Sequence, residues 1–386
     1  MPFNFDDLPS RRIQPFLNKW TAYPSDVLPM WVADMDFPVA PAIQQALHKH
    51  VDFGVLGYEI PEKRLYNIVA ARMKKLYGWD VNPDHILYTV GVNNGYNIAA
   101  RVLCNRQRGY FIQTPVYNEF WDAEKKTGAR QKTARLEKNV EGGRIRYTVD
   151  FDAFERAAKG SAMFLLCNPH NPVGRVFSRA ELKRMADICL EHDVTIVSDE
   201  IHSELLLDGA VFTPIAKLSR EVEKRTITLI SASKAYNVPG LACAFMIIPD
   251  DTLRAKFQTV LDGMSLEASI MGLTAAKVVY EGKADTWLGA LLKYLKGNRD
   301  FLVNFVEDNL PGVRVTKPEA TCLAWLDCSE LDLKPSPYNF FLKNAKVALS
   351  AGAKFGRESE KFVRLNFGTS RKRLEDGLKR MQKALK

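Results

Sequence analysis

The sequence has no long apolar run and little cysteine. No stretch approaches the roughly 18 uninterrupted apolar residues that a membrane-spanning helix requires, and the opening segment MPFNFDDLPSRR contains acids but no apolar core. The cysteines show neither CxxC spacing nor a nearby histidine cluster, which argues against a disulfide framework and against a zinc site. We therefore expect a cytoplasmic protein without a metal, whose cysteines are small buried apolar residues: Cys104, Cys167, Cys189, Cys243, Cys322 and Cys328.

Positive charge is in excess, but it is not concentrated. The chain has 386 residues, of which 46% are hydrophobic, and a formal net charge of +9. Its basic residues are spread along the chain and mostly interleaved with acids, so solvated faces explain them better than a nucleic-acid surface does. The densest basic stretch, 370–386, carries apolar residues at helical spacing and predicts an amphipathic closing helix: Leu374, Leu378, Met381 and Leu385.

Short β-rich runs alternate with helical segments in the middle of the chain. The runs cover residues 162–167, 194–197 and 226–231, and each ends in a polar, loop-like segment. Between the first two, the capping box Ser178-Arg-Ala-Glu181 opens a predicted helix. This alternation predicts an α/β fold with a mostly parallel sheet covered by helices. Ligands of such sheets bind beyond the carboxyl ends of the strands.

Three polar clusters follow these three strands, at 168–174, at 199–202 and at Lys234. An amide, an acid and an amine could therefore meet in one pocket. The Ser-Ala-Ser sequence before Lys234 could hold a phosphate beside the amine through its hydroxyls and the loop amides. Asp199 must have a partner at such a position, because a lone buried carboxylate is costly. A direct salt bridge between Asp199 and Lys234 is the structural alternative.

Four segments resemble, in order and spacing, the signature blocks of fold-type I pyridoxal-phosphate (PLP) enzymes of the aminotransferase class I/II superfamily. They are CNPHNPVG at 167–174, SDEIHSEL at 198–205, SASKAYN at 231–237 and FVRLNFG at 362–368. Further matches extend the resemblance over nearly the full chain: PMWVADMDF at 29–37, the Gly57-Tyr58 pair, TPVYNEF at 114–120 and PEATCLAWLD at 318–327. These are similar to one subgroup in particular, the carbon-sulfur lyases of the cystathionine β-lyase and cystalysin type.

The resemblance implies an architecture and an assembly. It implies a mostly parallel seven-stranded sheet in a large PLP-binding domain, residues 46–282, and a smaller α+β domain made of residues 1–45 and 283–386. It also implies a homodimer in which Tyr58 reaches the PLP phosphate of the second subunit. Tyr58 as an ordinary interface residue is the structural alternative. No nucleic-acid or membrane partner is expected.

The resemblance further implies a role for each site residue. Lys234 would carry PLP as a Schiff base and later act as the general base, and Asp199 would pair with the pyridine nitrogen. Tyr117 would stack on the ring and complete the catalytic set, although a core aromatic is its alternative. Asn171 would contact the ring oxygen of the cofactor, and His202 would be a further cofactor contact. The phosphate would be bound by a set of five residues: Gly91, Val92, Asn93, Ser231 and Ser233. For Asn93 the structural alternative is a turn.

The substrate would be held by its carboxylate. By the same resemblance Arg364 would take the α-carboxylate of an amino acid as a bidentate fork, a role that suits the planar guanidinium better than an ammonium. Trp31, Ala33 and Asn171 would complete the substrate-binding set. Arg364 lies in an apolar, strand-like run, where an unpaired guanidinium would be costly.

Departures from the aminotransferase pattern indicate the type of reaction. Ala242 stands where most aminotransferases of this fold have a phosphate-binding arginine, and His202 stands where many have a tyrosine. Both features are shared with the carbon-sulfur lyases, whereas Cys322 stands where a tyrosine is usual. The expected reaction is α,β-elimination from L-cystathionine or a cysteine S-conjugate, giving a thiol, pyruvate and ammonia. An aminotransferase is the nearest alternative, and a binding or regulatory protein that keeps the fold is the next.

Overall fold

A seven-stranded sheet forms the centre of the computed structural model, which describes residues 3–13, 16–58, 60–264 and 266–386. In spatial order its strands are β2 (Ile86–Thr89), β10 (Ala244–Ile247), β9 (Thr226–Ile230), β8 (Thr195–Asp199), β7 (Met163–Cys167), β3 (Tyr110–Thr114) and β4 (Gln131–Arg135). The strands from β9 to β4 are parallel, and β10 runs antiparallel to both of its neighbours. The predicted α/β fold with a mostly parallel sheet is therefore confirmed.

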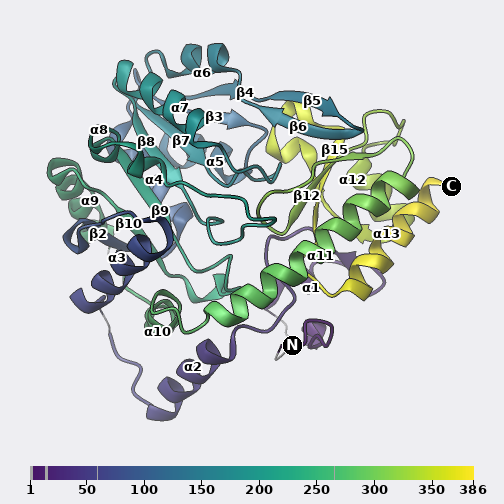
Figure 1. Cartoon of the computed structure of the whole chain (residues 1–386), viewed down its shortest axis with the longest axis horizontal. Coiled ribbons are helices and arrows are strands. Elements are labelled where there is room, and N and C mark those ends of the chain that lie inside the picture. Colours follow the sequence, from purple (N-terminus) through teal and green to yellow (C-terminus); the bar gives the residue numbers. More distant parts are fainter. Residues whose placement is uncertain (1–2, 14–15, 59, 265) are drawn as a thin grey trace.

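Helices cover both faces of this sheet (Figure 1). Alternate residues of β7 point to opposite faces, so Phe164 packs with one cluster of buried side chains and Leu165 with another. The first cluster includes residues of α6 (Phe151–Ala158) and α7 (Arg179–Glu191), and the second includes residues of α4 (Val92–Leu103), α5 (Glu119–Thr127) and α9 (Asp251–Met264). Burial on both faces explains why the central strands are continuous apolar runs. Further helices of this part are α2 (Pro41–Phe53), α3 (Lys63–Tyr77), α8 (Arg220–Lys224) and α10 (Ile270–Tyr280).

Two helix predictions are confirmed at the level of single contacts. The Ser178 hydroxyl accepts a hydrogen bond from the Glu181 amide, and the Glu181 carboxylate accepts one from the Ser178 amide, so the capping box opens α7. The closing helix is α13 (Arg371–Leu385), with Ser370 as its N-cap. Three of its four predicted core residues are fully buried, and the fourth, Leu385, packs partly buried against the same core.

A second, smaller sheet lies beside the first (Figure 1). Its antiparallel strands are β11 (Arg314–Val315), β12 (Leu323–Asp327), β15 (Phe362–Asn366) and β14 (Ser350–Ala351), and α11 (Asp285–Asn309), α12 (Pro337–Phe340) and α13 belong to the same half of the chain. The N-terminal segment, with α1 (Asn18–Thr21), joins this half through β1 (Leu28–Pro29), which pairs with β13 (Val347–Ala348). The domain limits of 46–282 and the remainder stay a prediction, and the limit at 45/46 falls inside α2. Over the described part of the chain, every helix is too short or too polar to span a bilayer.

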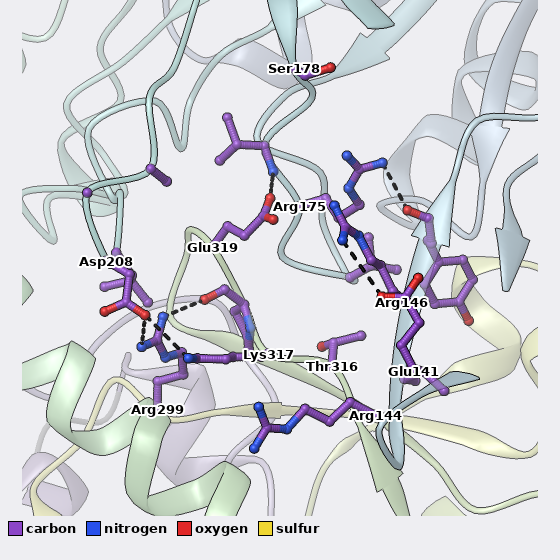
Figure 2. A pocket seen from close by; sticks show the side chains of 18 of the residues that line it. Glu141, Arg144, Arg146, Arg175, Ser178, Asp208, Arg299, Thr316, Lys317 and Glu319 are labelled. Atoms are coloured by element: carbon purple, nitrogen blue, oxygen red, sulfur yellow. Dashed lines mark hydrogen bonds and ion pairs between the residues drawn. The ribbon is translucent and has the colours of Figure 1, made fainter. Parts of the chain in front are cut away.

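The two sheets are connected where the segment 318–321 packs against the loop after β7. The amides of Glu319 and Ala320 donate to the carbonyl of Gly174 at 2.8 and 3.1 Å, and the Glu319 carboxylate accepts from the Val176 amide at 2.8 Å (Figure 2). The amide of Thr321 donates to the Leu205 carbonyl at 2.8 Å. This junction therefore contacts the loops that follow both β7 and β8.

A cavity of about 660 Å³ lies beside this junction. Figure 2 shows Arg146 and Arg175 on one of its walls, with Asp208, Arg299 and Lys317 on the opposite wall. One wall includes the hairpin of β5 (Glu137–Glu141) and β6 (Arg144–Thr148). Most of these charges already have partners in the chain: Arg175 pairs with Glu181 at 2.9 Å, and Arg299 pairs with Asp208 at 2.5 Å.

We expect Gly174→Ala to loosen this junction. A methyl group at Gly174, where φ is +77°, would lie 2.6 Å from Cβ and 2.9 Å from Cα of Pro318, so the segment 318–321 must move. Gly209→Ala is the matched control, because φ is +70° and no atom lies within 4 Å of the added methyl. Thermal and denaturant unfolding should show Gly174→Ala losing about 1–3 kcal/mol more stability than the control. Equal losses in the two variants would contradict the packing described here.

Candidate active site

Four predicted site residues meet at the carboxyl edge of the large sheet. The ends of β7 and β8 are aligned, because Cys167 pairs with Asp199 in register. The strand β8 extends two residues beyond the predicted end at Val197, so Asp199 is its last residue. Asn171 follows β7 and Lys234 follows β9. Arg364 comes from β15 of the small sheet and donates to the Asn171 side chain at 3.0 Å. Parallel strands and one antiparallel strand thus bring an acid, an amide, an amine and a guanidinium together.

Lys234 occupies the loop between β9 and β10. Its ammonium Nζ donates to the carbonyl of Ala33 at 3.0 Å. Burial lowers the pKa of Lys234, the charge of Arg364 lowers it further, and Cys322, Asp34 and Asp199 act in the opposite direction. Within the described residues, Lys234 and Asp199 form no ion pair, so the alternative of a direct salt bridge between them is wrong.

Asp199 is a buried acid with few partners. It is 4% exposed, and its Oδ1 accepts a hydrogen bond from the Ile201 amide at 3.1 Å. Burial raises the pKa of Asp199 to about 7, although the Ile201 amide and the charge of Lys234 lower it. The neighbouring Glu200 is also buried, and burial raises its pKa to about 8. A cationic partner would therefore stabilise the ionised form of Asp199 strongly.

Arg364 is held by neutral groups from three segments. Its Nη1 donates to Asn171, and its Nη2 donates to the Trp31 carbonyl at 2.9 Å and to the Ser350 hydroxyl at 3.2 Å. The guanidinium also lies 4.8 Å from the ring centre of Phe355. Because it is 5% exposed and these partners carry no charge, burial lowers the pKa of Arg364 to about 10. An anion placed here would gain an ion pair in a dry environment.

His202 faces the same group of residues. It is 3% exposed, and its Nδ1 is buried without a hydrogen-bond partner among the described residues. Burial and the charges of Lys234 and Arg364 lower the pKa of His202 to about 3. The imidazole is therefore neutral at physiological pH, and its unpaired ring nitrogen is free to interact with a ligand.

The start of α4 and the Ser-Ala-Ser segment provide further polar groups. Gly91 is the N-cap of α4, and no side chain caps the helix, so its first amides remain available to an anion. Asn93 lies in the first turn of α4 and is not a turn residue, and its side-chain amide lies 3.4 Å from the Tyr117 hydroxyl. The hydroxyls of Ser231 and Ser233 are 2.7 Å apart, and Ser231 also donates to the Cys243 carbonyl.

The segment 31–37 closes the site, and its anchor was not found by the sequence analysis. Asp36 is 2% exposed, and its carboxylate accepts from Lys19 and Trp20 at 3.0 Å each, from Arg11 at 2.9 Å and from Thr369 at 2.7 Å. Although burial raises it, these partners hold the pKa of Asp36 below its ordinary value. The anchored segment offers the two carbonyls, of Trp31 and Ala33, that accept from Arg364 and Lys234.

For Tyr58 and for two of the cysteines, the surroundings in the single chain differ from those predicted from the sequence. Tyr58 is not part of this group: it is 92% exposed and lines a surface cavity with Tyr66 and Tyr88. Cys104 and Cys243 are only partly buried, whereas the other four cysteines are buried as expected. Nowhere in the described ranges do three or more His, Cys, Asp or Glu side chains gather in a way that could hold a metal ion.

Solved structures place this architecture in the type I fold of PLP-dependent transferases. The chain is similar to cystalysin from Treponema denticola, whose structure contains a pyridoxal 5'-phosphate cofactor, with a TM-score of 0.93 and 30% identity over 100% of this chain and 99% of that one. It is also similar to the PLP-bound C-S lyase from Staphylococcus hominis, with a TM-score of 0.92 and 31% identity over 99% of each chain.

Sequence comparison gives the family. Residues 27–381 match the sequence pattern of Aminotransferase class I and II, and the chain belongs to this family. The cystathionine beta-lyase PatB of Bacillus subtilis is 38% identical over 366 residues, which cover 94% of this chain and 93% of that protein. The predicted resemblance is thus confirmed, and the role of each site residue stays a prediction.

The raised pKa of Asp199 predicts a stability change with pH. In the folded chain without a bound ligand it is about 7, above the ordinary value of 3.8, so the folded state binds a proton more tightly than the unfolded state between these pH values. Stability therefore falls as pH rises through this window, and the loss is complete above about pH 7. Asp199→Asn removes this loss and should stabilise the ligand-free protein by about 2–4 kcal/mol at pH 8, with little effect at pH 4.

Thermal melts of ligand-free wild type and Asp199→Asn at pH 4 and pH 8 measure this difference. Asp187→Asn serves as the control, since this exposed carboxylate on α7 pairs with Lys183 at the surface. An asparagine variant that melts below wild type at pH 8 would show that the charged form of Asp199 is already stabilised inside the chain.

Proposed function

We propose that this protein is a PLP-dependent carbon-sulfur lyase of the cytoplasm that cleaves L-cystathionine or a cysteine S-conjugate to a thiol, pyruvate and ammonia. One observation carries the proposal: Lys234, Asp199, Asn171 and Arg364 converge at the carboxyl edge of the sheet in a chain whose similarity to carbon-sulfur lyases extends over nearly its full length. A protein that only binds a partner would have no need of this buried and costly set of groups.

The residues present fit PLP. Asp199 is a buried acid whose ionised form needs a cationic partner, and the pyridine nitrogen of PLP is a weak base that can supply one on protonation. The unpaired ring nitrogen of His202 and the uncapped first turn of α4 suit the polar ring substituents and the phosphate. Lys234 provides the amine for covalent attachment. When bound, PLP supplies an electron sink that stabilises negative charge at the substrate Cα.

Lys234 is the proposed general base. Its lowered pKa favours the neutral amine, which is the form that removes the Cα proton. In its resting position Nζ is held by the Ala33 carbonyl at 3.0 Å, an acceptor that keeps the amine inside the site. Asp199 would hold a proton at the pyridine nitrogen, and with it the positive charge that draws electrons away from Cα.

Arg364 is the proposed carboxylate-binding residue. A substrate α-carboxylate that pairs with it would replace or join the neutral acceptors that now share the guanidinium. Asn171 would then lie between the substrate and the ring oxygen of PLP, and the Trp31 and Ala33 carbonyls would line the site. A carboxylate bound here would hold the substrate beside Lys234, among buried side chains that limit the access of water.

The phosphate would be held mainly by main-chain and hydroxyl groups. The amides of Gly91, Val92 and Asn93 at the start of α4 would bind it together with Ser231 and Ser233, and Tyr117 would stack on the ring. Ala242 leaves no guanidinium at the position eight residues after Lys234, which distinguishes this site from most aminotransferases of the fold. The uncapped start of α4 would take over the role of that cation toward the phosphate.

We also infer a homodimer with composite sites. Apolar side chains are strongly exposed at the end of α2 and in the segment that leads to α3: Phe53, Val55, Leu56, Tyr58 and Ile60 are 60–92% exposed. A monomer gains nothing from presenting such a run to water, and a second copy would cover it. Tyr58 would then approach the phosphate of the partner subunit.

The reaction type is tested by following pyruvate with coupled lactate dehydrogenase, using L-cystathionine with and without 2-oxoglutarate. The lyase should release pyruvate and thiol over many turnovers without a keto acid, because elimination sheds the amino group as ammonia with the product and leaves no amino group on the cofactor for a keto acid to remove. Lys234→Ala should show no turnover under the same conditions. The aminotransferase alternative replaces this proposal if product stops at one equivalent per site until 2-oxoglutarate is added and glutamate then accumulates.

The composite site is tested by mixing two variants. Tyr58→Phe should retain PLP poorly, and Lys234→Ala should be inactive, but a mixed dimer has one site with Lys234 from one subunit and Tyr58 from the other. After subunit exchange, activity should rise above the sum of the separate variants, to about a quarter of wild type for random pairing. A mixture without this gain, or a fully active monomer, would refute the inference.

A further inference from the structure

A cluster of charges around the buried Arg72 adjoins the Lys234 loop and has no part in the proposed chemistry. Arg72, on α3, is 2% exposed. Its Nη1 donates to Asp285 of α11 at 2.7 Å, and its Nη2 donates to the hydroxyl of Tyr236 at 2.7 Å and to the carboxylate of Glu204. The Tyr236 hydroxyl in turn lies 3.1 Å from Glu204 and 3.4 Å from Asp285.

Burial of the Arg72 guanidinium is energetically costly, which indicates that the cluster has a role other than stability. Burying a guanidinium costs several kcal/mol unless its partners are well placed, and here two carboxylates and a phenol share it. A packed apolar group would stabilise the same position as well or better. The benefit of the cluster is thus positional, since three charged side chains and one hydroxyl fix one another in a single arrangement.

Two members of the cluster lie close in the chain to residues of the candidate active site. Tyr236 is two residues after Lys234, and Glu204 is two residues after His202. Tyr236 is fully buried, its ring stacks on Trp287 of α11 at 6.4 Å, and its amide donates to the Ala232 carbonyl at 3.0 Å. The cluster therefore ties both loops of the site to α3 and α11.

We propose that Tyr236 and Arg72 are positioning residues, whose mutual hydrogen bond holds the Lys234 loop so that the lysine amine points at the reacting atom. The inference rests on the proposed function and adds residues to that same site. The side chains of Arg72 and Tyr236 form hydrogen bonds with each other, with Glu204 and with Asp285, so the role we assign to them is exerted through the Lys234 loop. The charged or titratable groups that face the amine itself are not altered by substitutions in the cluster: Asp199, Asp34, Cys322, Arg364 and His202.

Tyr236→Phe is the test, because it removes one oxygen and leaves the buried ring. Tyr110→Phe is the matched control: Tyr110 is also fully buried, and its hydroxyl donates to the Phe120 carbonyl at 2.9 Å, in another part of the core. The PLP-loaded proteins are titrated with pH while the absorption band of the lysine-bound cofactor is followed, and kcat and KM are measured with L-cystathionine.

Tyr236→Phe should shift the midpoint of the spectral titration by about half a unit or more and lower kcat about tenfold with KM within about twofold, because the base is misdirected while carboxylate binding is intact. Tyr110→Phe should do neither. Arg72→Met should lower kcat and shift the titration midpoint in the same way. Arg72→Lys should show a smaller change in both, since an ammonium can still donate to Tyr236. If Tyr236→Phe does not fold, Glu204→Gln, which keeps the shape and removes one charge, must show the same spectral shift.

The inference is overturned if Tyr236→Phe, or Glu204→Gln in its place, titrates like Tyr110→Phe and loses only thermal stability. Failure of the proposed function is recognised separately in wild type, where no lysine-bound band or no pyruvate release would be observed. If wild type has normal lyase activity and Tyr236→Phe is unaffected, the positioning role is refuted and the proposed function stands.

Discussion

The guanidinium of Arg364 is the interaction on which the arrangement of the site depends. It is the point where the large sheet, the small sheet and the N-terminal segment meet, through Asn171, Ser350 and Trp31. All three acceptors are neutral, so the chain buries a full positive charge without neutralising it locally. Burial of an unpaired charge is unfavourable, and the surrounding fold must supply the stability that offsets it. This is the expected condition of a residue whose counterion arrives with the substrate.

Asp36, in the N-terminal segment, is a second buried charge, but it is neutralised within the chain. Its partners of opposite charge are Lys19 and Arg11. The charge of Asp36, which has partners of opposite sign, fixes the segment, whereas the charge of Arg364 has only neutral partners and remains available to an anion. The carbonyls of Trp31 and Ala33 are held in place between the two, so the resting positions of Arg364 and Lys234 depend on an ion pair that takes no part in the chemistry.

Local patterns in the sequence predicted much of this structure. The strands at 162–167, 194–197 and 226–231, the capping box at Ser178 and the closing helix are short-range features, and parallel strand ends bring Asn171, Asp199 and Lys234 together without further information. The partners of Asp36 and Arg72 were not predicted, because they join positions far apart in the chain, such as Arg72 and Asp285, and any surface lysine or arginine has the same local signature. Tyr58 has no site contact that one chain alone could reveal.

The reversed direction of β10 also limits how Lys234 can move. Asn171 and Asp199 precede crossover connections that leave the edge of the sheet, whereas the loop 231–243 returns to the same edge and enters β10 beside β9, with Phe245 paired to Ile230. Both ends of this loop are therefore fixed by neighbouring strands, and the hydrogen bond between Arg72 and Tyr236 fixes its middle, two residues after Lys234. In the proposed reaction the amine of Lys234 would therefore change position by rotation about its own side-chain bonds, without displacement of the main chain that carries it.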